Sequence, residues 1–202
     1  MSNGETTLLL ELEKFLGEEL SVDSLMRDAI ALSAEQFGEA NTITQLRFLA
    51  DLKNALGDEA LPFAVGLLMS LPHREPDWRI LLAERQLPDL VNALSYFAPV
   101  QVAQNQFKTA SNKWKAEVEQ LILAPDYVKL LYLASLVKRV VDKDWHNFLQ
   151  QQQLVERACL AASLLGEHNE SLQTWVKLLH ATCEISYKSA SPKRGTLNLS
   201  LS

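Results

Sequence analysis

Proline placement is the feature that most constrains how this chain of 202 residues can fold. Proline lacks a backbone N–H and has a fixed φ, so it suits the first turn of a helix and disrupts a helix interior. Here the prolines fall at the starts, or just past the ends, of stretches whose apolar residues recur every three or four places. They are Pro62, Pro72, Pro76, Pro88, Pro99, Pro125 and Pro192. The sequence therefore predicts an all-α fold, an irregular helical bundle or short α-helical array of about nine to ten helices.

Acidic amphipathic helices are expected between residues 6 and 56, the first of them over 6–20. Short polar side chains mark helix starts because they accept hydrogen bonds from the free N–H groups of the first turn, and glycine marks helix ends. The expected signals are Ser21 as cap of the second helix, Thr42 with Gln45 as a capping box for the third, and Gly57 as its stop.

Proline-punctuated helices are expected over residues 59–190. Their expected boundary residues are Asp58 (cap of 59–71), Pro76, Pro88, Pro99 and Pro125 (helix starts), Asp144 and Asn169 (caps) and Gly166 (stop). Because no long linker separates these helices, we expect one all-helical domain over 1–190. A flexible tail is expected over 191–202. The tail's alternating leucines leave a second interpretation open, a strand that adds to a partner's sheet.

Charge is distributed unevenly along the chain. Residues 1–59 carry 4 Lys and Arg against 12 Asp and Glu, whereas residues 60–202 carry 15 against 13. An acidic N-terminal third repels nucleic-acid phosphates and anionic lipid, so we expect no nucleic-acid partner. The basic residues between 108 and 143 are interleaved with acids, as on solvated helix faces. The acidic third either keeps the protein soluble or attracts a basic partner.

The cellular compartment is predicted from cysteine usage and from the apolar runs. Cys159 and Cys183 are the only cysteines, and both lie in apolar helical contexts typical of free, buried thiols. The first residues lack the basic region of a signal peptide. No run approaches the roughly 18 continuous apolar residues of a membrane span. We expect a cytoplasmic protein with no membrane span.

No catalytic, metal-binding or nucleotide-binding pattern is evident in the sequence. The histidines have neither the spacing of a helical zinc pair nor that of a di-iron site. The glycine-rich phosphate loops and the Gly-x-Ser-x-Gly elbow are also missing. We therefore expect no catalytic residue, no metal and no cofactor, and a protein that is not an enzyme. The alternative is a small-ligand binder or enzyme with an inter-helix pocket, built around His146, Tyr132 or His180.

The densest helix-breaking signals occupy residues 71–78. Two prolines flank Arg74 and Glu75 there, and Trp78 follows. Loops held by rigid helices often carry contacts, and Trp and Arg are enriched at the energetic centres of interfaces. Arg74, Glu75 and Trp78 are therefore the predicted binding residues. The competing interpretation is structural, with Trp78 in the core and Arg74 or Glu75 tethering the turn.

At this segment the chain resembles an uncharacterised family of all-helical bacterial proteins, a domain of unknown function. In that family a Leu-Pro-x-Arg-Glu stretch leads into a Trp-rich helix. The matching residues are Leu71, Pro72, Arg74, Glu75 and Trp78, after the helix end AVGLLMS at 64–70. The chain differs in having Pro76 and Asp77 within the motif and a single Trp there. The resemblance implies a helical fold over residues 42–190 and a bacterial origin, and it implies no site.

These observations predict a non-enzymatic protein-interaction module. Its physical basis is abundant amphipathic helical surface, an acidic N-terminal third and no visible chemistry. The expected role is that of an adaptor or chaperone-like component of a bacterial assembly such as a secretion system. Its partners would be proteins, and the sequence fixes neither their identity nor the oligomeric state.

Overall fold

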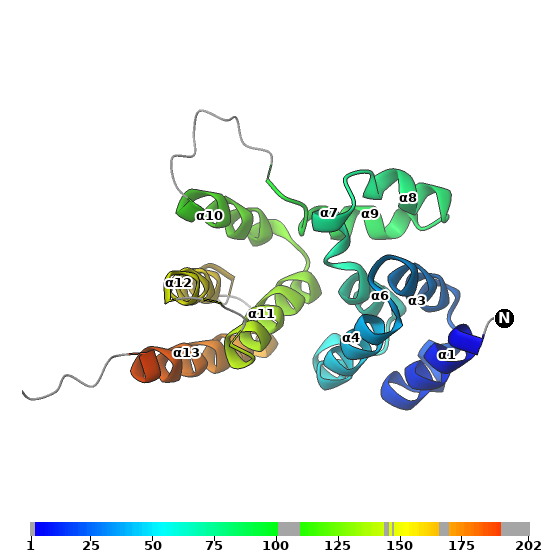
Figure 1. Ribbon diagram of the computed structural model, residues 1–202, viewed down its shortest axis with the longest axis horizontal. Helices are drawn as coiled ribbons and strands as arrows, with labels where there is room; N and C mark the ends of the chain where they lie inside the picture. Colours follow the sequence, from blue (N-terminus) through cyan, green and yellow to red (C-terminus); the bar gives the residue numbers. More distant parts are fainter. Residues whose placement is uncertain (1–2, 101–109, 144–145, 147, 166–169, 191–202) are drawn as a thin grey trace, which may run out of the picture. The chain divides into compact units, whose positions relative to one another are not determined.

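In the part of the chain that it describes, the computed structural model is built of α-helices and a 3₁₀ turn (Figure 1). It describes residues 3–100, 110–143, 146, 148–165 and 170–190. Over these residues it contains no strand, and ten of the α-helices have seven residues or more. The all-α prediction is therefore confirmed, and the number of these longer helices agrees with the expected nine to ten.

The chain divides into two compact units, Met1–Leu131 and Tyr132–Ser202, here called the N-terminal unit and the C-terminal unit. The helices up to the end of the N-terminal unit are α1 (Asn3–Leu16), α2 (Glu18–Val22), α3 (Ser24–Phe37), α4 (Glu39–Asp51), α5 (Lys53–Leu56), α6 (Ala60–Leu68), α7 (Leu71–Arg74), α8 (Trp78–Glu84), α9 (Pro88–Ser95) and α10 (Ala110–Gln120). A 3₁₀ turn, η1 (Leu121–Leu123), leads into α11 (Asp126–Val141), inside which the division falls. The expectation of a single domain over 1–190 stays a prediction.

Helix α6 is the centre of the N-terminal unit. Every residue from Pro62 to Leu68 is buried, and Phe63 has no exposed surface. A helix that is apolar on all sides needs neighbours on all sides. Helices α3 and α4 lie against α6, and α1 lies beside α4 (Figure 1). Gly66 permits a close approach of α4 to α6, because a Cβ at this position would collide with the Leu49 side chain.

Glycines, and not the predicted caps, divide the first helices. Gly17 has φ 101° and ψ 167° and separates α1 from α2, so the helix predicted over 6–20 is two helices. Gly38 has φ 84° and ψ 154° and separates α3 from α4. Residues with a Cβ are essentially excluded from this region of the backbone map. Each of these breaks therefore depends on glycine.

Two predicted caps are wrong for this reason. Ser21 lies inside α2, where its Oγ donates to the Glu18 carbonyl at 2.7 Å. The cap of α3 is Asp23, whose carboxylate accepts from the Met26 N–H at 3.1 Å. Thr42 does not open a helix either, because α4 already begins at Glu39 after the Gly38 break. Gly57 does end α5, as predicted, and its N–H donates to the Lys53 carbonyl.

The proline-rich segment forms a single short helix and then a break. Pro72 lies in the first turn of α7, and α8 begins at Trp78, two residues beyond Pro76. Upstream, α6 starts after Glu59 without a side-chain cap, so Asp58 does not have the predicted role. Pro88 is the first residue of α9 and Pro125 directly precedes α11, as predicted. Prolines therefore mark helix starts more reliably here than polar caps do.

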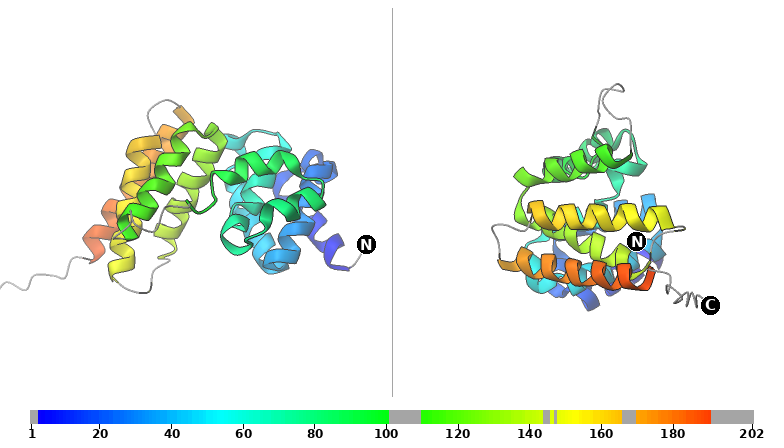
Figure 2. Two further views of the ribbon diagram at one scale, coloured as in Figure 1. Left: turned by 90° about the horizontal axis from the view of Figure 1, so that it is seen from above. Right: turned by 90° about the vertical axis from the view of Figure 1, so that its left-hand side faces the viewer.

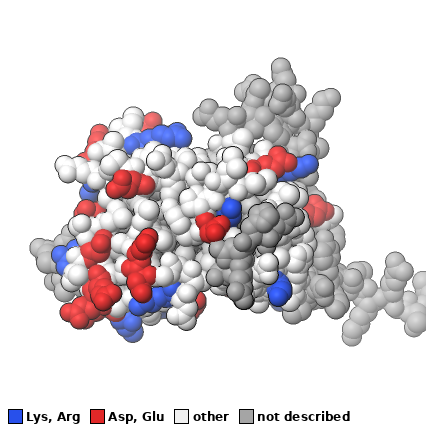
Figure 3. Space-filling model, turned by 180° about the vertical axis from the view of Figure 1, so that it is seen from behind, with Lys and Arg blue, Asp and Glu red and all other residues white. Residues whose placement is uncertain are grey.

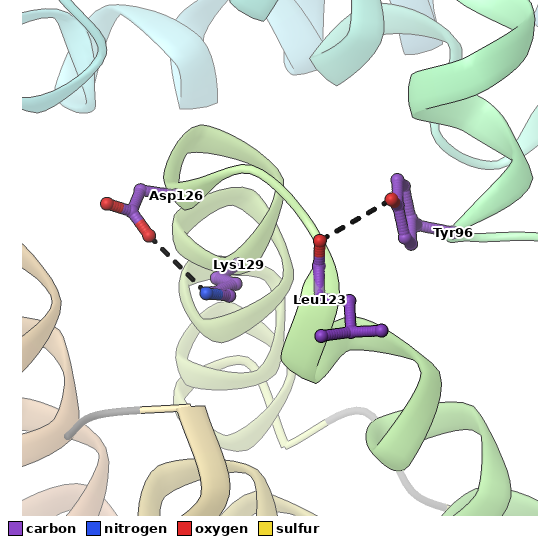
Figure 4. A network of polar contacts seen from close by, with 4 residues as sticks. All are labelled: Tyr96, Leu123, Asp126 and Lys129. Atoms are coloured by element: carbon purple, nitrogen blue, oxygen red, sulfur yellow. Dashed lines mark hydrogen bonds and ion pairs between the residues drawn. The ribbon is translucent and has the colours of Figure 1, made fainter. Parts of the chain in front are cut away.

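Side chains tie α9 to the segment that precedes α11. Gln120 Nε2 donates to the carbonyls of Tyr96 (2.8 Å) and Ala98 (3.2 Å). Tyr96 points its hydroxyl at the Leu123 carbonyl, 3.5 Å away (Figure 4). Burial raises the pKa of neighbouring Tyr127, and the nearby Tyr96 and Glu59 raise it further.

The C-terminal unit contains the end of α11 together with α12 (Phe148–Leu165) and α13 (Glu170–Ala190). Helices α12 and α13 lie side by side (Figure 2). Tyr132 on α11 accepts a 2.6 Å hydrogen bond from Arg157 Nε on α12. The predicted boundaries at Asp144, Gly166 and Asn169 lie outside the described residues, as do the start of the helix expected after Pro99 and the tail over 191–202.

Candidate functional site

The three predicted binding residues lie in different environments. Arg74, at the end of α7, is exposed, and its guanidinium lies 5.2 Å from the centre of the Phe37 ring. Glu75 is half-buried in the break after α7. Trp78 is only 3% exposed, so its indole packs in the core of the N-terminal unit. Arg74 lines a cavity, and binding by Arg74, Glu75 and Trp78 stays a prediction.

That cavity, here called the Arg74 pocket, has a volume of about 180 Å³. It is bounded by α3, α4, α6, the residue before α7 and the last residue of α7. Its lining residues are Ser33, Phe37, Asn41, Thr44, Gln45, Leu67, Ser70 and Arg74. Hydroxyl and amide groups dominate this lining, and it contains one cation and no carboxylate. A pocket with this composition favours a small polar ligand over an apolar one.

Hydrogen bonds within the N-terminal unit fix which atoms of the pocket stay free to bind. Asn41 Nδ2 donates to the Phe37 carbonyl at 2.7 Å, and Gln45 Nε2 donates to the Gly66 carbonyl at 3.0 Å. Thr44 Oγ1 likewise donates to the Ala40 carbonyl at 2.9 Å. Each bond uses one hydrogen of the side chain, so the amides of Asn41 and Gln45 each keep a second N–H. The side-chain oxygens therefore keep lone pairs for a ligand.

A second and larger cavity, here called the α1–α3 groove, has a volume of about 520 Å³. It is lined by α1, α3, the start of α4 and the residue that follows α8. The lining residues are Leu8, Leu9, Arg27, Asp28, Ile30, Ala31, Ala34, Glu35, Glu39 and Arg85. Leu8 and Ile30 are each 3% exposed and form its apolar floor. Charged side chains form the rim, where Arg85 is ion-paired with Glu35.

Acidic residues surround this groove. Asp28, Glu35 and Glu39 on its rim outnumber Arg27 and Arg85. Figure 3 shows acidic side chains (red) gathered on one face of the N-terminal unit. The acidic charge is evident in the sequence, whereas the groove is not. The run Leu8-Leu9-Leu10 was the available signal, because three successive leucines make the apolar surface of α1 wider than one helix face requires.

The residues of the predicted alternative site are not brought together at either cavity. Tyr132 is buried against Arg157, whereas His146 and His180 are exposed. Among the described residues, no cluster of three or more His, Cys, Asp or Glu is arranged to hold a metal ion. None of the described helices combines the length and the apolar composition that crossing a membrane requires.

The two cysteines of the C-terminal unit are neighbours. Cys159 on α12 is partly exposed and Cys183 on α13 is 2% exposed, and both thiols are free. Burial raises the pKa of the Cys183 thiol to about 12, and the adjacent Cys159 thiol contributes to the rise. Because thiolates are the reactive form, Cys183 is a structural residue at neutral pH.

Comparisons with known proteins add no assignment: no protein-family model, no curated protein and no solved structure matches this chain. The all-helical architecture is consistent with the resemblance to an uncharacterised helical family. Function must therefore be argued from the two cavities of the N-terminal unit.

Proposed function

We propose that this chain is a protein-interaction module that binds a basic, amphipathic helix of a partner protein in the α1–α3 groove. The observation that carries the proposal is the combination of an apolar floor and an acidic rim in one open cavity of about 520 Å³. An amphipathic helix places apolar side chains at i, i+3, i+4 and i+7 into such a groove.

The shape of the groove supports a helical partner. Ala31 and Ala34 lie three apart on α3 and contribute small side chains to the lining. Residues three apart share a helix face, so this face offers a shallow surface that another helix can approach closely. Leu9, Ala31 and Ala34 keep exposed apolar surface that a partner helix can cover, above the already buried Leu8 and Ile30.

Charge selects the class of partner. Residues 1–59 carry 12 acidic against 4 basic residues, so the field around the groove attracts Lys and Arg and repels acidic helices. Such complementarity raises the association rate and rejects wrong partners more than it adds affinity. The proposed wider role is that of an adaptor or chaperone-like component of a bacterial, cytoplasmic assembly.

The test is a titration with two synthetic helical peptides that share a Leu face and differ in having Lys or Glu on the other face. Fluorescence anisotropy measures their affinity for the full chain. The Lys peptide is expected to bind and the Glu peptide is not. Ala31→Lys places a charged side chain in the groove and is expected to weaken binding about tenfold or more.

Val22→Lys is the matched control. Val22 is 60% exposed on α2 and is not part of the groove lining. Its replacement by Lys changes the net charge by the same amount as Ala31→Lys does. This variant is expected to bind the Lys peptide within about twofold of the unmodified protein. Equal losses in the two variants would show attraction by net charge alone and would contradict docking in the groove.

A further inference from the structure

We propose that the Arg74 pocket binds a small carboxylate that also carries a hydrogen-bond donor next to the carboxylate, such as an α-hydroxy or α-amino acid or the last residue of a peptide. This inference is independent of the α1–α3 groove, because the two cavities share no lining residue. It is carried by Arg74 and by the polar side chains that line the pocket with it.

Arg74 supplies the cation. Among the residues that the structure describes, no carboxylate makes an ion pair with its guanidinium, although the surrounding unit is strongly acidic. Its contact with the Phe37 ring, 5.2 Å from the ring centre, restrains the side chain and leaves the edge N–H groups available. A planar guanidinium held in this way matches a carboxylate through two parallel hydrogen bonds.

The pocket lining does not oppose an anion. It includes no Asp or Glu, and Ser70, which precedes α7, adds a hydroxyl that can donate. Without a carboxylate in the lining, a bound anion meets little repulsion inside the cavity. Arg74 and Ser70 therefore offer donors to a carboxylate.

Other lining residues offer acceptors. Thr42 Oγ1 donates to the Gly38 carbonyl at 3.1 Å, so the 2.9 Å bond between Ser33 and Thr42 uses the hydroxyl hydrogen of Ser33. Ser33 Oγ therefore keeps lone pairs, as do the amide oxygens of Asn41 and Gln45. Ser33 is 1% exposed, and a buried acceptor needs a donor. A ligand with an O–H or N–H beside its carboxylate supplies that donor while its carboxylate binds Arg74.

The test follows backbone and arginine side-chain resonances of the full ¹⁵N-labelled chain by NMR. The probes are L-lactate, L-alanine, and N-acetyl-trialanine with a free or an amidated C-terminus. Shifts at Arg74, Ser70 and Asn41 with lactate or alanine identify a free small acid as the ligand. Shifts with the free-acid peptide alone identify a peptide C-terminus. Equal shifts with the amidated peptide, or no shifts with any probe at about 20 mM, would overturn the proposal.

Arg74→Gln removes the cation at an exposed position and is expected to weaken binding by at least about tenfold. Arg79→Gln is the matched control, since Arg79 is also exposed and its guanidinium lies 4.5 Å from the Trp78 ring centre, outside the pocket. Melting temperatures of both variants are measured beside the titrations. Unchanged affinity of the Arg74→Gln variant would also overturn the proposal.

Discussion

At the scale of single residues, the sequence predicts which kinds of side chain matter better than it predicts their roles. Ser21 and Asp23 are both good capping residues, two positions apart, and periodicity alone does not choose between them. The choice follows from Gly17, which starts α2 early enough to place Ser21 inside that helix. Arg74 was predicted as a binding residue of the proline-bounded turn, and the cavity that it lines draws its other residues mainly from α3 and α4, far away in the sequence.

The capping assignment leads to a stability prediction. Asp23→Ala removes the acceptor for the Met26 N–H and is expected to lower the free energy of unfolding by about 1 kcal/mol. Ser21→Ala, which removes only an exposed bond to the Glu18 carbonyl, is expected to change it by less than about 0.5 kcal/mol. Urea denaturation followed by circular dichroism measures both. A larger loss for Ser21→Ala would restore Ser21 as the cap.

The cysteine pair leads to a pH prediction. Because the pKa of Cys183 is raised to about 12, the folded protein keeps this proton where the unfolded chain, with a pKa near 9, loses it. Above pH 9 the unfolded state therefore binds fewer protons than the folded state. The contribution of the Cys183 thiol to the free energy of unfolding is fully present below pH 9 and is lost as the pH rises toward 12.

Native protein at pH 8 is expected to react with iodoacetamide at Cys159 well before Cys183, as read by peptide mass spectrometry. Faster labelling of Cys183 would contradict its burial.

At the scale of elements, the existence of the helices follows from apolar periodicity, and their ends do not. The helix predicted over 6–20 has a continuous pattern of apolar residues, yet Gly17 divides it because the chain adopts a backbone conformation open only to glycine. Such a break depends on how α1 and α2 pack, which periodicity does not encode. Prolines fix φ locally, so the starts of α9 and α11 were predictable.

The packing of α6 against α4 leads to a second stability prediction. Gly66→Val places a branched side chain where even a Cβ meets Leu49 and Leu131, both fully buried. Overpacking of this kind is expected to cost about 1–3 kcal/mol, despite the better helix propensity of Val. Ala83→Val on the exposed face of α8 is the control and is expected to cost less than about 0.7 kcal/mol. A stabilised Gly66→Val variant would show that α6 and α4 are less tightly packed.

At the scale of the whole molecule, the all-α class was predictable and the division into two units was not. The division falls inside α11, an uninterrupted helix without a glycine or proline at the boundary, so no local signal marks it. The charge asymmetry was visible in the sequence, since the acidic residues cluster before residue 60. The α1–α3 groove, which has acidic residues in its lining, depends on tertiary packing and is evident only in the structure.

The most direct test of the proposed function is to map where the Lys-faced peptide binds on the ¹⁵N-labelled chain. Docking in the groove predicts the largest NMR shifts at Leu9, Ala31 and Ala34, which line it on α1 and α3. Non-specific attraction predicts shifts spread over exposed acids outside the groove, such as Glu18 and Glu19 on α2. Shifts concentrated on α1 and α3 would support a helix-binding groove, and shifts spread evenly, or centred elsewhere, would contradict it.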